Sequence, residues 1–252
     1  MLDQITPVIL TYNEAPNIGR TLERLDWARE VVVVDSFSDD DTVTIARTFA
    51  NVRVVQRRFD TMEQQWSFGV AQIASEWVLT LDADYFATDA FVHELAELQP
   101  PQNVSAYEAR FIYAIGGRPL RATLYTPRPV LLRIGRFSIY QDGHTQRVRV
   151  DGAVERLREP LIHDDRKSWP RFLERQRVYM RQEAAKLRST PWRKLNAAGR
   201  VRRLLVVAPF AVLVHTLFVR GLILDGRAGL KYAWERFVAE LILSRELING
   251  RA

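Results

Sequence analysis

Two aspartates one residue apart are the side chains whose type and spacing most directly suggest chemistry. Asp82 and Asp84 follow the apolar run of residues 77–81, which predicts a buried parallel strand running out into a loop. An apolar strand gains nothing from ending in two like charges unless a cation lies between them. A divalent metal that holds phosphate oxygens would supply that cation. The alternative is a solvated strand end with an ordinary acidic turn.

The segments around this pair alternate between strand and helix patterns. Apolar runs predict strands at residues 6–11, 31–35, 52–56 and 77–81. Helical patterns lie between them, with Ile18, Leu22 and Leu25 on one face and a longer helix over residues 62–75. This alternation indicates a parallel sheet, and ligands of such sheets bind outside the carboxyl ends of the strands. Asp35, Asp82 and Asp84 all stand at such ends.

Three motifs occur in a fixed order: TYNEA at residues 11–15 with NI at 17–18, VDSFSDDDT at 34–42, and LDAD at 81–84. Together they resemble the nucleotide-sugar half of glycosyltransferase family 2, nearest to the branch that glucosylates lipopolysaccharide core. The resemblance covers about the first 100 residues. It implies a GT-A-like α/β fold, an open, mostly parallel sheet flanked by helices.

The resemblance also implies roles for individual residues. Tyr12 would lie against the nucleobase, Glu14 and Asp35 would contact base or ribose, and Asp82 would orient the ribose or the donor sugar. Asp84 would hold a divalent metal, Mg²⁺ or Mn²⁺, on the diphosphate. The full set expected to bind the nucleotide sugar is Thr11, Tyr12, Glu14, Asp35, Ser36, Asp82 and Ala83.

The chain departs from the family at two positions of the second motif. Ser36 replaces a frequent second aspartate, and Phe37 replaces a frequent glycine, while uridine remains the expected base. Asp82 and His163 are the candidates to complete the metal shell around Asp84. For His163 the alternative is a histidine with a structural role at a strand end.

Sugar transfer also needs a base for the acceptor hydroxyl. The position that corresponds to the family's carboxylate is Gln146, and glutamine cannot accept a proton at neutral pH. Asp142 is the first substitute and His144 the second. Asp142 could equally be a turn residue before Gly143.

The chain divides into three expected parts: a nucleotide-sugar-binding half (1–100), an acceptor-binding and catalytic half (101–188), and a helical region associated with a membrane (189–252). In the middle part, residues 104–113 and 120–125 predict a hairpin, and residues 168–188 predict a helix. Residues 221–229 predict a turn, and residues 230–247 predict the last helix.

Charge is split along the chain. Residues 1–100 hold 7 Lys/Arg against 17 Asp/Glu, although the whole chain carries a formal net charge of +6. No acid occurs at residues 184–224, where the basic residues adjoin the uncharged run 204–219. This arrangement favours an anionic membrane surface over nucleic acid as the partner. The basic residues are Lys186, Arg188, Arg193, Lys194, Arg200, Arg202, Arg203 and Arg220.

The apolar run is too short to cross a membrane with ease, because a spanning helix needs about 20 apolar residues. An interfacial or re-entrant helix pair is expected, and the alternative is a buried helix hairpin. The chain has no cysteine, which excludes disulfides and thiolate metal sites. Its first residues lack a secretory signal pattern, so we expect a cytoplasmic protein, peripheral on the inner face of the cell membrane.

The sequence therefore predicts an inverting glycosyltransferase that moves a sugar from a nucleoside-diphosphate donor to a lipid-linked or lipopolysaccharide-type glycan acceptor. Two alternatives stay open. A nucleotidyltransferase on a similar sheet would carry a Gly-rich, basic loop after the first strand, unlike residues 12–16. A non-catalytic, membrane-associated relative would account for Gln146.

Overall fold

The computed structural model describes residues 1–142 and 145–250, which form two compact units. The first, here called the sheet unit, holds Met1–Ala114, Tyr125–Gln141 and Thr145–Arg166. The second, the helical unit, holds Ile115–Leu124, Asp142 and the C-terminal segment from Lys167 onward.

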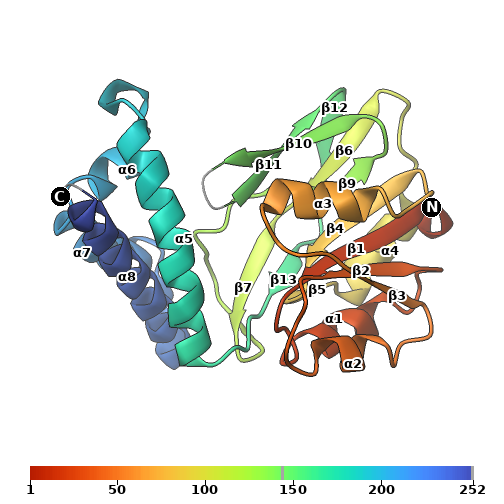
Figure 1. Cartoon of the computed structure of the whole chain (residues 1–252), viewed down its shortest axis with the longest axis horizontal. Helices are drawn as coiled ribbons and strands as arrows, with labels where there is room; N and C mark the ends of the chain where they lie inside the picture. Colours follow the sequence, from red (N-terminus) through yellow and green to blue (C-terminus); the bar gives the residue numbers. More distant parts are fainter. Residues whose placement is uncertain (143–144, 251–252) are drawn as a thin grey trace. The chain divides into compact units, whose positions relative to one another are not determined.

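A seven-stranded sheet in the order β12-β6-β9-β4-β1-β2-β3 forms the sheet unit (Figure 1). Strands β1 to β4 are mutually parallel, β9 runs antiparallel to both β4 and β6, and β12 is parallel to β6. The chain moves from β1 outward to β3 and then returns to the other side of β1, which makes the carboxyl ends of β1 and β4 a topological switch point. The bounds are β1 (Ile5–Thr11), β2 (Val31–Asp35), β3 (Val52–Gln56), β4 (Trp77–Asp82), β6 (Val104–Ala109), β9 (Arg128–Arg133) and β12 (Ala153–Arg156).

The following shorter strands and helices lie outside the seven-stranded sheet, and all of them except β8 belong mainly to the sheet unit. A second sheet has the order β5-β13-β7-β8, and β10 pairs with β11. These strands are β5 (Tyr85–Phe86), β7 (Phe111–Ile115), β8 (Arg118–Pro119), β10 (Phe137–Asp142), β11 (Thr145–Val150) and β13 (Leu161–His163). The helices are η1 (Leu2–Gln4), α1 (Ile18–Leu22), η2 (Glu23–Leu25), α2 (Thr42–Ala46), α3 (Met62–Val70) and α4 (Asp89–Glu97).

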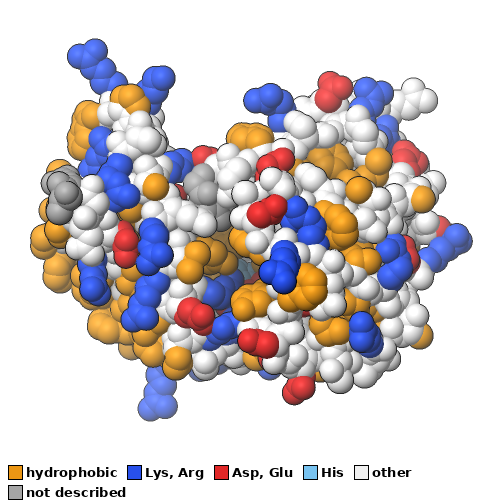
Figure 2. Space-filling view, viewed as in Figure 1, with side chains coloured by type: hydrophobic (Ala, Val, Ile, Leu, Met, Phe, Trp, Pro, Cys, Tyr) orange, Lys and Arg blue, Asp and Glu red, His pale blue; other side chains and the backbone are white. Residues whose placement is uncertain are grey.

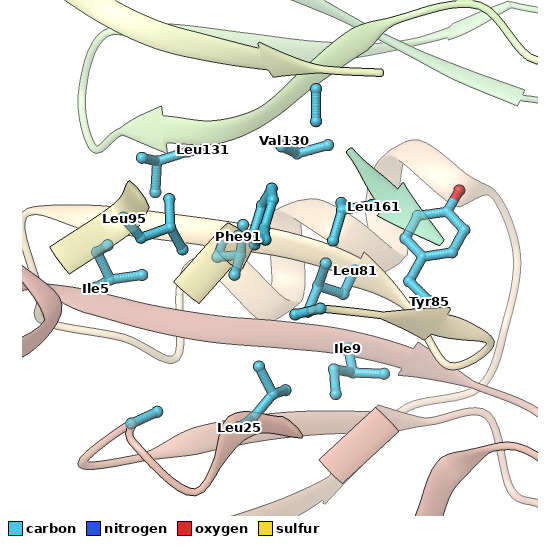
Figure 3. Packing of buried hydrophobic residues seen from close by; sticks show 14 of the residues in the cluster. Ile5, Ile9, Leu25, Leu81, Tyr85, Phe91, Leu95, Val130, Leu131 and Leu161 are labelled. Carbon is cyan, nitrogen blue, oxygen red and sulfur yellow. The ribbon is translucent and has the colours of Figure 1, made fainter. Parts of the chain in front are cut away.

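Alternating side chains of the parallel strands supply two separate cores. Ile9 and Leu81 pack with Phe91 of α4 in one cluster (Figure 3), whereas Val8 packs with Trp66 of α3 in the other. Successive strand residues point to opposite faces of a sheet, so the two clusters lie on opposite faces. Helix α4 therefore packs on one face of the central sheet and α3 on the other. Fully burying each of these large side chains stabilises the fold by about 1.5–3 kcal/mol. The predicted open, mostly parallel α/β sheet flanked by helices is confirmed.

The helical unit is built around its last and longest helix. Met180, Ala184 and Leu187 of α5 pack against Leu243 and Leu247 of α8. The guanidinium of Arg202 joins the same two helices, because it contacts Glu183 at 3.3 Å and Glu240 at 2.8 Å. The elements are α5 (Trp169–Ser189), η3 (Trp192–Lys194), α6 (Ala197–Arg202), α7 (Val207–Val214), η4 (His215–Val219), η5 (Leu222–Asp225) and α8 (Gly226–Asn249).

Three predicted elements differ from the structure. Residues 120–125 form no strand: the Arg121 amide donates to Asp225 and the Leu124 amide to the Tyr232 hydroxyl, each at 3.0 Å. These backbone donors are therefore satisfied by side chains instead of a neighbouring strand. Helix α3 ends at Val70, and α8 begins at Gly226 within the predicted turn.

Within the described part of the chain, no single helix is both long and apolar enough to cross a membrane. Val207–Val219 and Leu222–Asn249 reach that length and composition only as a pair, and they are bent by 72° where they join.

Candidate active site

The loops after β1 and β2 are joined by hydrogen bonds from Asn13. Its backbone amide donates to Ser38 Oγ at 2.9 Å, its side-chain amide donates to Asp39 Oδ1 at 2.7 Å, and its carbonyl oxygen accepts from the Asp39 amide at 3.0 Å. Asn13 has a φ of 53°, a left-handed conformation that asparagine adopts more readily than most residues. Because β1 and β2 are parallel neighbours, the two motifs that follow them form one surface.

Asp35 at the end of β2 is completely buried. Its carboxylate accepts hydrogen bonds from Thr11 Oγ1 at 3.2 Å, from the Ser38 amide at 3.0 Å and from Gln56 Nε2 at 3.0 Å, and the Ser38 hydroxyl also donates to it. In this structure Asp35 therefore fixes the loop around Ser38, and its contact with base or ribose stays a prediction.

Two aromatic side chains lie exposed on this surface, Tyr12 at 50 % and Phe37 at 51 %. Phe37 has a φ of 62°, in the left-handed region that glycine occupies without strain. The departure from a frequent glycine thus falls where the backbone itself favours glycine. Ser36, beside it, accepts a hydrogen bond from Gln65 Nε2 at 2.9 Å.

Asp84 and His163 come together although 79 residues separate them. The antiparallel pairing of β5 with β13 sets His163 opposite Tyr85, and the Asp164 amide donates to the Asp84 carbonyl at 3.1 Å. His163 Nε2 lies 3.2 Å from Asp84 Oδ2, and the two residues are only 9 % and 5 % exposed. The imidazole ring lies 4.6–5.3 Å from the ring centroids of Tyr85, Tyr113 and Tyr125. Packing therefore fixes the histidine against the second aspartate of the motif.

Asp82 has different surroundings from Asp84. It is paired in register with Leu10 of β1, and its Oδ2 lies 3.3 Å from the guanidinium of Arg128. Ala83 between the two aspartates is buried, and its carbonyl accepts a hydrogen bond from Thr21 Oγ1 at 2.7 Å. The two carboxylates therefore differ in partner, one beside an arginine and the other beside a histidine.

A buried amide that the sequence analysis did not assign connects the β1 loop to the segment after β13. The Asn17 side chain donates to Glu14 at 2.9 Å and to Asp165 at 3.1 Å, and it accepts from the Arg166 amide at 3.0 Å. Nearby, Arg20 contacts the Asp164 carboxylate at 3.0 Å. The NI pair of the first motif was the only sequence signal for this network.

The residues predicted to bind the donor and the metal all lie in the sheet unit, at or just beyond the carboxyl ends of its strands. Asp142 belongs to the helical unit, where its carboxylate lies 2.5 Å from Lys186 Nζ. His144, the second candidate base, lies outside the described residues.

Another carboxylate is strongly perturbed in the loop after β3. Arg57 contacts both oxygens of Asp60 at 2.9 Å, and this hydrogen bonding lowers the pKa of the Asp60 carboxyl to about 2. The same guanidinium donates to Gln65 Oε1 at 2.7 Å, and Gln65 in turn holds Ser36. The β3 loop is thereby joined to the loop after β2.

Over residues 1–142 and 145–250, no three His, Cys, Asp or Glu side chains gather closely enough to enclose a metal ion by themselves. The pair Asp84 and His163 offers one oxygen and one nitrogen donor, and His163 Nδ1 has no hydrogen-bond partner within the described residues. The carboxylate suits a divalent metal such as Mn²⁺ or Mg²⁺ when further oxygens come from a bound phosphate, whereas an imidazole nitrogen is a softer ligand that Mg²⁺ does not favour.

Known sequences similar to this chain are glycosyltransferases. The model of glycosyl transferase family 2 matches residues 6–146. An uncharacterized glycosyltransferase of Rickettsia felis is 31% identical over 109 residues, which are 43% of this chain and 38% of the relative. The lipopolysaccharide core biosynthesis glycosyltransferase LpsC of Rhizobium meliloti is 25% identical over 182 residues, 64% of this chain and 65% of LpsC. The match thus spans about two fifths of the Rickettsia relative's length.

Solved structures share the fold over nearly the whole chain. The mannosyltransferase PcManGT of Pyrobaculum calidifontis, determined with GDP-Man and Mn²⁺, has a TM-score of 0.54 at 16% identity over 99% of this chain and 88% of its own. Residues 1–349 of S. aureus TarS, determined with UDP-GlcNAc, have a TM-score of 0.52 at 15% identity over 98% of this chain and 91% of that one. The predicted GT-A-like fold is confirmed by these neighbours. Because the family model matches more than half of its residues, the chain belongs to glycosyl transferase family 2.

Proposed function

We propose that this chain transfers a sugar, with inversion, from a nucleoside-diphosphate donor to a hydroxyl of a lipid-linked or lipopolysaccharide-type glycan. One observation carries the proposal: the motifs after β1 and β2 are hydrogen-bonded into one surface, and the Asp-Ala-Asp motif ends the adjacent strand at the switch point. Ligands of open α/β sheets bind at such a point. Membership in glycosyl transferase family 2 supports a nucleotide sugar as that ligand.

The donor would bind along the exposed aromatic and buried polar groups of this surface. Tyr12, which is half exposed, would stack against the base. Glu14 is held by Asn17, so its carboxylate has a fixed orientation for a ribose or base contact. Uridine remains the proposed base, and guanosine is the competitor to test, because structures of similar fold bind both kinds of donor.

Asp84 and His163 would hold the divalent metal. When bound, the metal would stabilise the negative charge that develops on the leaving diphosphate. His163 keeps the Asp84 carboxylate in place through their 3.2 Å contact, and the surrounding tyrosines limit the access of water.

Asp142 is the proposed base for the acceptor hydroxyl, and His144 is the second candidate. The Asp142 carboxylate lies 2.5 Å from Lys186 Nζ, a contact that would hold it in place. Asp164 is a weaker candidate, because two guanidinium groups, those of Arg20 and Arg166, already contact its carboxylate.

We further propose that the helical unit binds the surface of an anionic membrane, where a glycolipid acceptor would be found. One helical stripe on α7 and η4 consists of Val207, Phe210, Val214 and Phe218, and each of these side chains is more than half exposed. A second stripe on α8 consists of Leu230, Trp234, Leu241 and Ile248, all exposed. Phe210 of the first helix meets Phe237 of α8 at 5.5 Å, so the stripes are adjacent. We call these eight residues the apolar face.

Figure 2 shows hydrophobic side chains gathered over the C-terminal helices, with Lys and Arg beside them. An exposed apolar patch of this extent, bordered by cations, is typical of interfacial helices. Half of the predicted basic cluster has partners inside the helical unit: Lys186, Arg188, Arg202 and Arg203. Arg193, Lys194, Arg200 and Arg220 are exposed and remain available to anionic lipid. Each contributes about 1 kcal/mol near such a surface.

A donor screen with the purified full chain tests the catalytic proposal. UDP- and GDP-sugars would be incubated with the chain, Mn²⁺ and a detergent-solubilised glycolipid extract, and the released nucleotide and glycosylated product would be measured. We expect one donor to give product, whose anomeric configuration by NMR is opposite to that of the donor. Binding of donor without hydrolysis or transfer would instead favour the non-catalytic relative, and a nucleotidyl product would favour the nucleotidyltransferase.

A further inference from the structure

Arg128 lies beside the first aspartate of the Asp-Ala-Asp motif, where the sequence analysis placed no residue. It is the first residue of β9, which runs antiparallel to β4, so the beginning of β9 adjoins the end of β4. Its Nη2 lies 3.3 Å from Asp82 Oδ2 and 3.4 Å from the Tyr125 hydroxyl. The acidic site therefore contains a cation that belongs to the chain.

Three aromatic rings hold this guanidinium. Its central carbon lies 5.4 Å from the ring centroid of Tyr85 and 5.1 Å from those of Phe111 and Tyr125. Cation–π contacts within about 6 Å are attractive, and the planar guanidinium stacks well on such rings. The side chain is nevertheless 31% exposed, so a ligand in solution can reach it.

The two hydrogen bonds of Arg128 use only one of its nitrogens. Both start from Nη2, and within residues 1–142 and 145–250 neither Nη1 nor Nε has a hydrogen-bond partner. Arginine carries five N–H donors in a rigid fork that matches the oxygens of a phosphate. A fixed, partly exposed guanidinium with unused donors is suited to bind an anion at this edge of the sheet.

We propose that Arg128 binds the diphosphate of the nucleotide donor directly, as a cation beside the metal. In this arrangement Asp82 orients Arg128, and Asp84 and His163 would coordinate the metal. The inference rests on the proposed function, because it takes a nucleoside diphosphate as the ligand. Its consequence is distinct, however: the positive charge of arginine is permanent, so part of the nucleotide affinity persists without metal.

Arg133 provides a matched control on the same strand. It ends β9, its guanidinium lies 4.7 Å from the ring centroid of Trp77, and its Nε lies 3.4 Å from Glu76. Arg133 and Arg128 are thus both arginines next to an aromatic ring and a carboxylate. Arg133 lies at the opposite end of the strand, away from the carboxyl ends of β1 and β4. Its substitution controls for the loss of a charge and of a stacked side chain.

The test measures UDP and GDP binding by calorimetry to the full chain, once with Mn²⁺ and once with EDTA. We expect the parent to bind one nucleotide in both conditions, more weakly with EDTA. R128Q should lower the affinity with EDTA by about 10- to 100-fold, the range for a lost hydrogen bond to a charged group. R128K, which keeps the charge but not the fork, should lose less, and R133Q should bind like the parent.

The outcomes separate the two proposals. If the parent binds neither nucleotide even with Mn²⁺, the proposed function fails and the inference fails with it. If the parent binds with Mn²⁺ but not at all with EDTA, the metal alone holds the diphosphate and only the inference is overturned; this arm requires no variant. Equal binding by R128Q and parent in EDTA, with similar melting temperatures, would also overturn it.

Discussion

The two units of this chain depart from the usual distribution of residues in different ways: the sheet unit buries polar side chains, and the helical unit exposes large apolar ones. We call each departure an inversion. At the carboxyl edge of the sheet, Asn13, Asn17, Asp35 and Asp84 are buried. In the helical unit, Phe210, Phe218 and other large apolar side chains are exposed. Buried polar groups lower stability unless they are hydrogen-bonded, and exposed apolar patches promote association. Each inversion therefore fits one of the two proposed ligands, the nucleotide sugar at the polar surface and lipid at the apolar one.

The buried polar groups of the sheet unit are supported by an internal hydrogen-bond network, whereas no described element of the helical unit covers its exposed apolar side chains. Asn13 makes three hydrogen bonds between the β1 and β2 loops. The Asn17 side chain makes four within its own cluster, to Glu14 and Asp165 and from Arg20 and the Arg166 amide. Such a network fixes the site before any ligand arrives. The apolar face, in contrast, would lower its free energy when an apolar partner, such as the proposed lipid, covers it. We expect substitutions at the carboxyl edge of the sheet to lower nucleotide binding or sugar transfer, and substitutions in the apolar face to lower membrane binding.

The largest effect is expected at Asp84. Asp84→Ala removes the carboxylate that His163 contacts, and with it the proposed metal ligand, so sugar transfer should fall by at least about 10³-fold. Nucleotide binding should lose its dependence on Mn²⁺, as measured by calorimetry, while circular dichroism shows an intact fold. Asp89→Ala, an exposed aspartate five residues further on, is the control. Donor binding as tight as in the parent with Mn²⁺ would show that the metal role is wrong.

Asp142 is expected to have the next largest effect. Asp142→Asn should lower kcat by about 10²- to 10⁴-fold with little change in donor affinity, because a general base acts mainly in the transition state. The substitution also breaks the ion pair with Lys186. Lys186→Gln breaks the same pair but keeps the carboxylate, so it should retain most of the activity. Equal losses in both variants would indicate a structural ion pair, and the search for the base would move to His144 and Asp165.

The central sheet and its ligand edge could be predicted from the sequence because they depend on local patterns. Apolar runs of strand length, followed by polar loops, gave β1, β2 and β4, and the parallel order put Asp35, Asp82 and Asp84 at one edge. The contacts of Asn17 and Arg128 depend on the pairing of segments 148 and 46 residues away. The spacing of apolar residues along the sequence does not predict such contacts, because they form only when distant segments come together in the folded sheet.

In the helical unit, too, the contacts of individual charged residues could not be predicted from the sequence. Composition predicted a basic cluster next to an apolar run, but it could not distinguish cations that face solvent from cations that join helices. Arg202 reaches Glu183 and Glu240 only because α5 and α8 pack on either side of it. Membrane attraction should therefore depend less on charge, and more on the apolar face, than the sequence suggested.

Substitution of the apolar face tests this directly. The double variant Phe210→Ser, Phe218→Ser should lower binding to anionic vesicles by about 10- to 100-fold. Each ring is only somewhat more than half exposed, so its burial in lipid contributes about half of the 1.5–3 kcal/mol of a fully exposed phenylalanine. Phe59→Ser removes an equally exposed phenylalanine from the sheet unit and should bind as the parent does. Co-sedimentation at low and high salt would measure both, with part of the parent's binding persisting at high salt. Equal sedimentation of the parent with and without vesicles would contradict a membrane role.

The smallest effect is expected at Phe37, an exposed apolar ring on a strained backbone at the carboxyl edge of the sheet. Its φ of 62° costs a residue with a β-carbon about 1–2 kcal/mol, and glycine removes that strain. Phe37→Gly should therefore leave the free energy of unfolding unchanged or raise it by up to about 1 kcal/mol in urea titrations. Phe37→Ala keeps the strain but loses the ring, so it should be the less stable of the two variants. If the ring stacks on the nucleobase, both variants should bind nucleotide about 3- to 10-fold more weakly, so that Phe37→Gly becomes as stable as the parent but a poorer binder. Unchanged nucleotide affinity in both variants would make Phe37 a surface residue, and Tyr12 would be left as the aromatic contact of the base.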